Sequence, residues 1–403
     1  MKAGWVKRKL GEVTSKIGSG ATPLGGEEAY KTAGIALIRS LNVYDDGFRD
    51  ERLARIDDVQ AAKLSNVIVD AGDVLLNITG ASVARCCLAP AHLCPARVNQ
   101  HVSIIRPIKQ KLSSDLLHYL LISKIYKDGL LYAGEEGVST RQAITKAQLQ
   151  DFVIEYPESL SEQQRIVGIL DAALDGIAQA AASAEQNLQN ARALFDSHLQ
   201  SVFTQRGEGW LKKRIEEIGT TQTGSTPKTS DKNNYGDFIP FIKPADFNAD
   251  GSLNYENDGL SEQGFAQARK VSEGSVLMVC IGATIGKCGW CDRDVTTNQQ
   301  TNSLTPAEGT SYKFIYYQML TEGFQRRVIH SSGQATLPII NKSKWSALTV
   351  WLPPTLDEQE LIVAKLDALR EETQRLESLY RRKLAALAEL KQSLLHQAFS
   401  GML

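Results

Sequence analysis

Six cysteines and six histidines are among the side chains of this 403-residue chain that could hold a metal ion or attack a substrate. The most suggestive spacing is Cys288-Gly289-Trp290-Cys291. A Cys-x-x-Cys sequence can be a redox-active dithiol or one half of a zinc site. No second pair of this kind lies nearby, and Cys86 takes the place of Cys288 in the other copy of a repeat described below. We therefore interpret the motif as part of a turn between strands.

The histidines show no metal-ligand spacing. His198 lies on an apolar helical stripe, where a buried polar residue is the simplest interpretation. The cysteines are too few and too unevenly spaced for a disulfide framework in so long a chain, so we expect reduced thiols.

Motifs that would carry catalysis are not recognisable in the sequence. It has no GxxxxGK[ST] phosphate loop, no [DNS]PP[YF] amino-methyltransferase motif beside a glycine-rich loop and no PD…(D/E)xK nuclease motif. We expect no catalytic, cofactor-binding or metal site on this chain.

Charge is balanced along the whole chain, with a formal net charge of -1. Residues 1–160 carry 20 Lys and Arg against 18 Asp and Glu, and residues 207–355 carry 15 of each. A nucleic-acid partner would therefore have to be neutralised by a small basic face or by a partner subunit. We find no run of about 18 uncharged apolar residues and expect a cytoplasmic protein without a membrane span.

A duplication supplies the elements that position these residues. Residues 161–205 and 357–401 superimpose without a gap at a constant offset of 196, as continuous helices require, because one extra residue turns an apolar stripe by about 100°. Upstream the copies still correspond, but the offset drifts from 205 to 196, as in loops of different length on a shared framework. Each unit is thus a variable globular part followed by a helix.

Each globular part contains apolar segments of strand length, one helical pattern (115–131 and 312–328) and a closing strand that runs into proline. In the helices that follow, apolar positions alternate at spacings of three and four, as in coiled coils. The first stripe includes Phe195, His198 and Val202, and the second includes Tyr380, Lys383, Leu387 and Leu390. The most economical packing is antiparallel, with a pseudo-twofold axis between the copies.

This chain resembles the specificity subunit of type I restriction-modification systems over its whole length. The family's LPP-x-L-x-EQ sequence is matched by residues 352–359 and more weakly by residues 156–163. A glycine-acid pair before a strand, followed by two glycines, is matched by Gly72-Asp73 with Gly80 and by Gly274-Ser275 with Gly282 and Gly286. Each copy departs once, at Ala84 and at Ser275.

The resemblance implies an α+β fold with two mixed α/β target-recognition domains related by a pseudo-twofold, each followed by a long helix, the two helices forming an antiparallel coiled coil. We expect recognition domains at 1–158 and 207–354 and helices at 159–206 and 355–403. The implied partners are double-stranded DNA, two modification (methyltransferase) subunits and restriction (translocase and nuclease) subunits. S-adenosylmethionine, ATP and Mg would belong to those subunits. Alternatives are a specificity subunit of another restriction class and a coiled-coil scaffold that does not bind DNA.

For DNA reading, we expect polar side chains on the variable loops, since Arg, Asn and Gln read base edges while Lys, Ser and Thr mostly hold phosphates. A solvated loop or a fold-supporting hydrogen bond is the alternative for each. Asn99-Gln100 and Asn298-Gln299 occur in both copies, so we assign them to the framework. The candidates are Ser19, Thr22, Arg39, Asn77, Arg85, Thr140, Arg141 and Gln142 in the first copy, and Ser225, Thr226, Lys228, Lys243, Lys287, Gln300 and Gln334 in the second.

Overall fold

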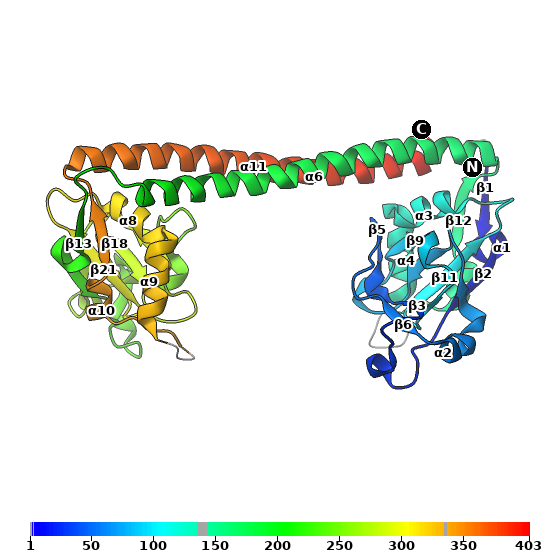
Figure 1. The fold of residues 1–403 in the computed structure, drawn as a ribbon, viewed down its shortest axis with the longest axis horizontal. Coiled ribbons are helices and arrows are strands. Elements are labelled where there is room, and N and C mark those ends of the chain that lie inside the picture. The colour runs from blue at the N-terminus through cyan, green and yellow to red at the C-terminus, as the bar shows by residue number, and fades with distance from the viewer. Residues whose placement is uncertain (1, 3, 136–142, 334–336) are drawn as a thin grey trace. The chain divides into compact units, whose positions relative to one another are not determined.

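The fold of this chain is known from a computed structural model that describes residues 2, 4–135, 143–333 and 337–403 (Figure 1). It divides into two compact units. Unit 1 is Met1–Glu185 with Arg381–Leu403, and unit 2 is Gln186–Tyr380. Both units take one end of each long helix, so the division runs through the helices rather than between the sequence repeats.

Unit 1 contains three sheets besides a two-stranded β4–β5 hairpin. Strand β1 pairs with β12, and the two four-stranded sheets have the orders β6-β3-β10-β7 and β2-β11-β8-β9. The strands are β1 (Trp5–Lys9), β2 (Thr14–Ser19), β3 (Ile35–Ile38), β4 (Val43–Tyr44), β5 (Gly47–Phe48), β6 (Ala54–Ile56), β7 (Ile68–Val69), β8 (Val74–Asn77), β9 (Cys86–Leu88), β10 (Ala96–Val98), β11 (Val102–Pro107) and β12 (Val153–Pro157).

Unit 2 repeats these sheets in the same order. Strand β13 pairs with β22, and the four-stranded sheets are β16-β15-β20-β17 and β14-β21-β18-β19. In both units the pairing that joins β3 to β10, or β15 to β20, is parallel. The strands are β13 (Leu211–Arg214), β14 (Gly219–Thr223), β15 (Tyr235–Ile242), β16 (Gly259–Leu260), β17 (Lys270–Val271), β18 (Val276–Val279), β19 (Cys288–Trp290), β20 (Val295–Thr297), β21 (Thr301–Pro306) and β22 (Thr349–Leu352).

The helical pattern expected as one element is two helices in each unit. Ser123 and Thr321 have extended backbone (ψ 145° and 143°) and separate α3 from α4 and α8 from α9. The side chain of Thr321 accepts a hydrogen bond from Phe324 N and so caps α9. The helices are α1 (Leu10–Val13), α2 (Asp58–Lys63), α3 (Ser114–Ile122), α4 (Lys124–Glu135), α5 (Lys146–Asp151) and α6 (Leu160–Thr204), then α7 (Glu262–Phe265), α8 (Tyr312–Leu320), α9 (Glu322–Ser332), α10 (Lys342–Ser346) and α11 (Leu356–Ser400).

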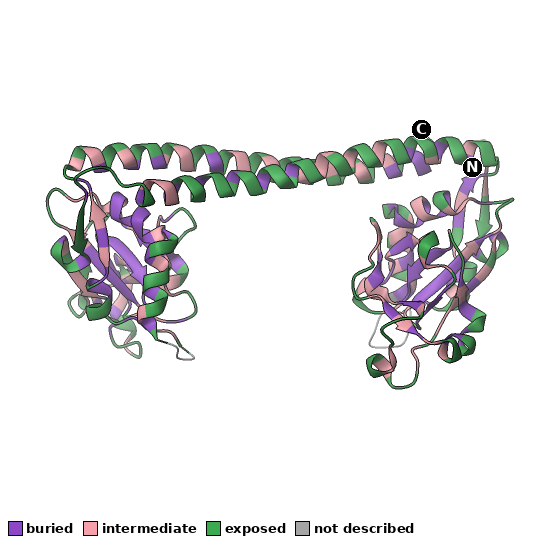
Figure 2. Cartoon of the chain, in the orientation of Figure 1, coloured by how far each residue is buried: buried purple, intermediate pink, exposed green. Residues whose placement is uncertain are grey.

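Each unit buries one face of a four-stranded sheet against the long helices (Figure 2). In unit 1, Ile166 and Leu170 of α6 and Leu395 of α11 join the core of β8, β11 and α3. In unit 2, Phe195, Leu199 and Phe203 of α6 and Leu366 of α11 join the core of β18, β21 and α8. Both ends of both helices are therefore part of a domain core.

The two long helices run antiparallel within each unit. In unit 1, Arg165 Nη2 donates to Leu403 O, while Ala178 and Lys391 line one cleft. In unit 2, Arg192 pairs with Glu377, and the Arg370 guanidinium lies 4.7 Å from the centre of the Phe195 ring. Residue numbers thus rise along α6 as they fall along the facing part of α11.

Three predicted stripe positions are wrong. His198, expected to be buried, is exposed, because the buried stripe of α6 continues in steps of four through Phe195, Leu199 and Phe203. Lys383 and Leu390 of α11 are exposed as well, whereas Leu395 is fully buried. A stripe predicted from alternating spacings of three and four residues leaves the contact face where the buried residues are in fact spaced four apart several times in succession.

Helix α6 contains no run of about 18 uncharged residues, in line with the expectation from the sequence, but among the described helices it is a candidate for a membrane span. An 18-residue window within it has a hydropathy of 1.3, and by length and composition the helix could form a span. Its apolar side chains Ile166 and Leu170 are instead buried in the core of unit 1. On the same helix, Asp171 Oδ1 accepts a hydrogen bond from Tyr119, so this part of α6 packs on a folded domain.

The same polar contacts fix each helix to its domain in both copies. Gln163 Oε1 accepts from Ser113 N at 2.9 Å, and its Nε2 donates to Lys111 O and Pro157 O. Gln359 Oε1 accepts from Ser311 N at 2.9 Å, and its Nε2 donates to Gly309 O and Thr355 O. Both glutamines are almost fully buried, so the shared Glu-Gln sequence sets the register of helix on domain.

Candidate nucleic-acid interface

Three loops of unit 1 meet beside the end of β8. Gly20 N donates to Asn99 O at 3.1 Å, and Ile78 N donates to His101 O at 2.9 Å. A Cβ on Gly20 would lie 1.8 Å from Val98 O, so only glycine permits this approach. The strands thereby bring the 20–23 loop, the 79–85 turn and the 99–101 turn together.

A chain of side-chain hydrogen bonds crosses these loops. Thr22 Oγ1 bonds Gln100 Oε1 at 2.5 Å, Gln100 Nε2 lies 3.1 Å from His101 Nε2, and His101 Nδ1 bonds Thr79 Oγ1 at 2.5 Å. Asn99 is buried, and its Oδ1 accepts from His101 N at 3.0 Å. Asn99 thus shapes the turn, while Gln100 and His101 stand on its surface.

Unit 2 builds the same turn with different outward groups. Thr226 bonds Gln299, and Asn298 Oδ1 accepts from Gln300 N at 3.1 Å. Gln300 occupies the place of His101, and its O accepts from Cys280 N at 2.7 Å. Ile281 replaces Thr79, so the hydrogen-bond chain of unit 1 does not continue there.

Arg85 faces a pocket of about 410 Å³ in unit 1. The guanidinium carbon lies 4.6 Å from the centre of the Tyr44 ring. A cation held over an aromatic face keeps its in-plane N–H donors available. The pocket is lined by Ser40, Leu41, Tyr44, Thr79, Gly80, Ala81, Ser82, Arg85 and His101.

Two of the predicted cations are held within the fold. Arg39 donates to Glu27 at 2.9 Å and to Arg52 O at 2.6 Å, and lies 5.1 Å from the centre of the Tyr30 ring. Its counterpart Lys243 pairs with Asp258 at 2.7 Å. Both positions therefore support loops, and neither has an uncommitted charge to offer.

The remaining candidates are scattered. Asn77 was predicted to read DNA from a loop. It is instead fully buried and donates to Ser40 O at 2.9 Å, which makes it part of the framework. Ser19 is half-buried at the end of β2, the Ser225 hydroxyl is buried, and Lys228 is exposed. Lys287 and Gln300 are half-buried in unit 2, and Gln300 Oε1 accepts a hydrogen bond from Asn298 Nδ2 at 2.9 Å. Thr140, Arg141, Gln142 and Gln334 lie outside the described residues.

Sequence reasoning missed Tyr44, Thr79 and His101. Tyr44 and Thr79 come from β4 and from the turn after β8, and only the tertiary fold brings them to Arg85. For His101 a signal existed: it directly follows the shared Asn-Gln pair, at a position where the copies differ.

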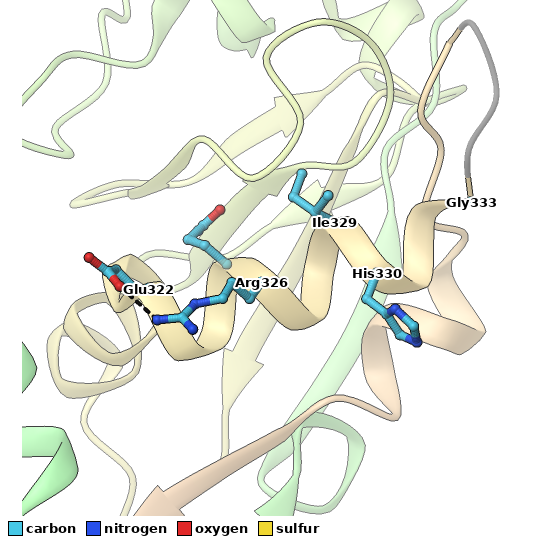
Figure 3. Close-up of a pocket in the computed structure, with 6 residues that line it drawn as sticks. Glu322, Arg326, Ile329, His330 and Gly333 are labelled. Carbon is cyan, nitrogen blue, oxygen red and sulfur yellow. Dashed lines mark hydrogen bonds and ion pairs between the residues drawn. The ribbon is translucent and has the colours of Figure 1, made fainter.

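Another cavity, of about 920 Å³, lies along one face of α9 in unit 2 (Figure 3). Arg326 on this face pairs with Glu322 at 2.7 Å. The charges in this cavity therefore satisfy one another. Gly333, the last described residue that lines it, precedes Gln334.

The Cys-x-x-Cys sequence was predicted to be a turn between strands. Its first three residues instead form strand β19, and Cys291 directly follows that strand. The turn precedes it at Gly286, which has φ +88°. Cys288 and Cys291 are buried, and their thiols donate to Gly286 O and Ser272 O. Burial raises the pKa of Cys291 to about 11 and raises that of Cys288 further. Among the described residues, no cluster of three or more His, Cys, Asp or Glu could hold a metal ion.

The chain contains two copies of a sheet domain, each joined to a long helix. The two copies share a framework but differ in the polar residues of their turns, which is typical of proteins with two recognition domains. The profile of the type I restriction modification DNA specificity domain matches residues 2–185 and 207–383. The chain belongs to this family, with two recognition domains.

Curated relatives are type I specificity subunits. The HindI subunit of Haemophilus influenzae is 31% identical over 149 residues, which cover 36% of this chain and 32% of that protein. The MjaIX subunit of Methanocaldococcus jannaschii is 26% identical over 159 residues, 38% and 36% of the two chains. In these alignments the chain thus spans about a third of each relative's length.

Solved structures share the fold over nearly the whole chain. A structure from work on complex assembly and conformational transition of the type I restriction-modification system has a TM-score of 0.76 and 18% identity, covering 99% of this chain and 98% of its own. The HsdS subunit of Thermoanaerobacter tengcongensis has a TM-score of 0.62 and 19% identity, covering 100% and 98%. The expected mixed α/β fold with two sheet-rich domains and two long helices is confirmed.

Proposed function

We propose that each recognition domain reads one half of an asymmetric bipartite DNA target for a type I restriction-modification enzyme. The observation that supports this most is the polar turn 99–101 and its counterpart 298–300. Their asparagines and backbone bonds are the same, while the outward residue is His101 in one and Gln300 in the other. A shared frame with different hydrogen-bonding edges suits two readers of different sequences.

The long helices fit the docking of two modification subunits, with restriction subunits joining through them. Large apolar side chains on these helices are exposed: Leu194, Leu361 and Leu390 at 51%, 57% and 46%. Apolar side chains that are exposed on a helix can take part in a partner surface where they form a contiguous patch. We assign no catalysis to this chain, so S-adenosylmethionine, ATP and Mg would act on the partner subunits, in the cytoplasm and without membrane attachment.

Binding by the reconstituted complex across a salt series tests the DNA function. Specific binding should weaken as salt rises, because each contacted phosphate releases counterions. A coiled-coil scaffold that does not bind DNA, the alternative compatible with the net charge of -1, predicts neither sequence preference nor salt dependence. Methylome sequencing of the host strain would supply both half-sites and the gap between them.

The proposed role of the helices as spacers between the two recognition domains is tested by deleting residues 178–184 and the equivalent residues 374–380. Seven residues are one heptad, so the apolar stripe keeps its phase. The permitted gap should shorten while both half-sites stay unchanged. An altered half-site sequence would contradict the spacer role.

A further inference from the structure

We propose that Arg85 reads a guanine, so that the half-site of the first recognition domain contains a G·C pair, and that Tyr44 is the residue that positions it. This inference rests on the proposed function, because it names one base of the target that this domain would read.

The backbone of Arg85 is fixed on both sides. Arg85 N donates to Ser82 O at 3.2 Å, and its O accepts from Asn77 N at 2.8 Å. The preceding residue, Ala84, has φ +65° and is fully buried. The side chain therefore leaves the loop in one direction, toward the ring of Tyr44.

The guanidinium has its donors available. Within the ranges that the structure describes, it makes the ring contact with Tyr44 at 4.6 Å and no hydrogen bond or ion pair. Arg49 approaches the same ring at 5.1 Å, but its Nη2 donates to Asp46 at 2.6 Å. No carboxylate is among the described residues that line the pocket that Arg85 faces, so no described acid competes there with a ligand.

The second unit shows what happens where this pair is absent. Arg39 N bonds Asn42 Oδ1, and Lys243 N bonds Asp246 Oδ2, in the same 3-10 turn at an offset of 204. At that offset Asn248 stands in the place of Tyr44. At the offset of 202 that relates Cys86 to Cys288, Lys287 stands in the place of Arg85. Arginine with an aromatic platform is thus replaced by lysine without one.

This joint replacement distinguishes base reading from phosphate binding. Both Arg and Lys can bind phosphate or bond the O6 and N7 atoms of guanine, but only the planar fork of Arg gains a fixed orientation from an aromatic face, and a fixed orientation matters for reading a base edge rather than for holding a phosphate. A loosely held phosphate contact would not need an aromatic ring to orient the cation. We therefore assign base reading to Arg85 and phosphate binding to Lys287.

The test uses the full chain reconstituted with its modification subunits and a library of duplexes that varies one position at a time. Arg85→Ala should weaken cognate binding about 10- to 100-fold and remove the preference at one G·C pair of one half-site. Arg85→Lys should not restore that preference. Tyr44→Ala should weaken it, and Tyr44→Phe should retain it.

Lys287→Ala is the matched control in the second unit. It should lower affinity for all sequences alike, with a salt slope smaller by about one, and leave every base preference intact. A uniform loss of this kind for Arg85→Ala would overturn the proposal, as would a lost preference at an A·T pair. A wild-type complex without any sequence preference would instead refute the proposed function.

Discussion

Units 1 and 2 differ most clearly at one position in their common sheet. Asp73 in unit 1 is 2% exposed and holds Arg106 of the neighbouring strand through two bonds of 2.7 Å. In unit 2 the same two positions are Ser275 and Thr305, whose hydroxyls lie 2.8 Å apart. Both partners have changed together. A buried polar position therefore tolerates different chemistry as long as its partner matches it.

The junction between domain and helix also differs between the units, but without such a matched exchange. In unit 2, Lys313 pairs with Asp367 at 2.9 Å, and Arg370 lies against the rings of Phe195, Tyr316 and Tyr317. At the corresponding places unit 1 has Asp115 and Leu174, and its cleft is larger, about 360 Å³ against 170 Å³.

The largest expected effect comes from breaking the buried pair of unit 1. Asp73→Ala should lower the free energy of unfolding of unit 1 by about 3 kcal/mol, since it leaves a half-buried guanidinium with only the more exposed Asp70 and the carbonyl of Ile68 among its described partners. Ser275→Ala should cost unit 2 about 1 kcal/mol. Hydrogen exchange read separately for each unit measures both. The double variant Asp73→Ser with Arg106→Thr should recover most of the loss, and its failure to do so would show that the pairs are not interchangeable.

The second largest difference between the units is expected at the turn before β9 and β19. Gly286→Ala should destabilise unit 2 by about 2 kcal/mol, because φ is +88° and a Cβ would lie 2.2 Å from Gln325 Oε1. Ala84→Gly should change unit 1 by less than about 0.5 kcal/mol, as relief of its left-handed backbone offsets the lost buried methyl group. Equal effects in thermal denaturation would contradict this difference.

Exchanging the junction residues should have a smaller effect. Arg370→Leu should cost unit 2 about 1.5 kcal/mol, because the guanidinium also donates to Asp250 O and to Tyr316. Leu174→Arg should leave unit 1 within about 0.5 kcal/mol, since Asp171 and Asp175 beside it favour a cation. Urea denaturation followed at each unit would measure both, and a strongly destabilised Leu174→Arg would show that the two junctions are not equivalent.

The smallest difference concerns the thiols. Burial raises the pKa of Cys280 to about 12 and of Cys291 to about 11, so at pH 8 only about one Cys291 in a thousand is a thiolate. Cys94 in unit 1 is half-buried, so its thiol is more accessible. Alkylation of the native protein should therefore modify Cys94 first. Rapid reaction of Cys291, or zinc in the purified protein, would contradict a structural role for the Cys-x-x-Cys sequence.

The sequence predicted the elements that depend on local periodicity. The duplication, the long helices and the strand segments followed from spacing alone. The breaks at Ser123 and Thr321 did not, since the apolar pattern continues through both. His198 was misplaced because the contact face of a long helix shifts with its partner, which a single helical stripe cannot show.

The site was harder to predict, because the use of a loop side chain depends on distant neighbours. Arg39 and Arg85 were both predicted to read DNA, yet Glu27 and Tyr30 engage the first, while among the described residues Tyr44 holds the second. The assignment of the two Asn-Gln pairs to the framework followed from their presence in both copies. It fits Asn99 and Asn298, which are buried and accept from the backbone N–H two residues on, whereas Gln100 and Gln299 are exposed.

The sharing of cores between the repeats has a consequence for how the protein is made. Leu395, Ala398 and Phe399 lie in the core of unit 1, although they are translated after all of unit 2. The sheets of the first domain therefore leave the ribosome before the residues of α11 that complete their hydrophobic core. Of the two domains, the one synthesised first is completed only after the other, once α11 has been made.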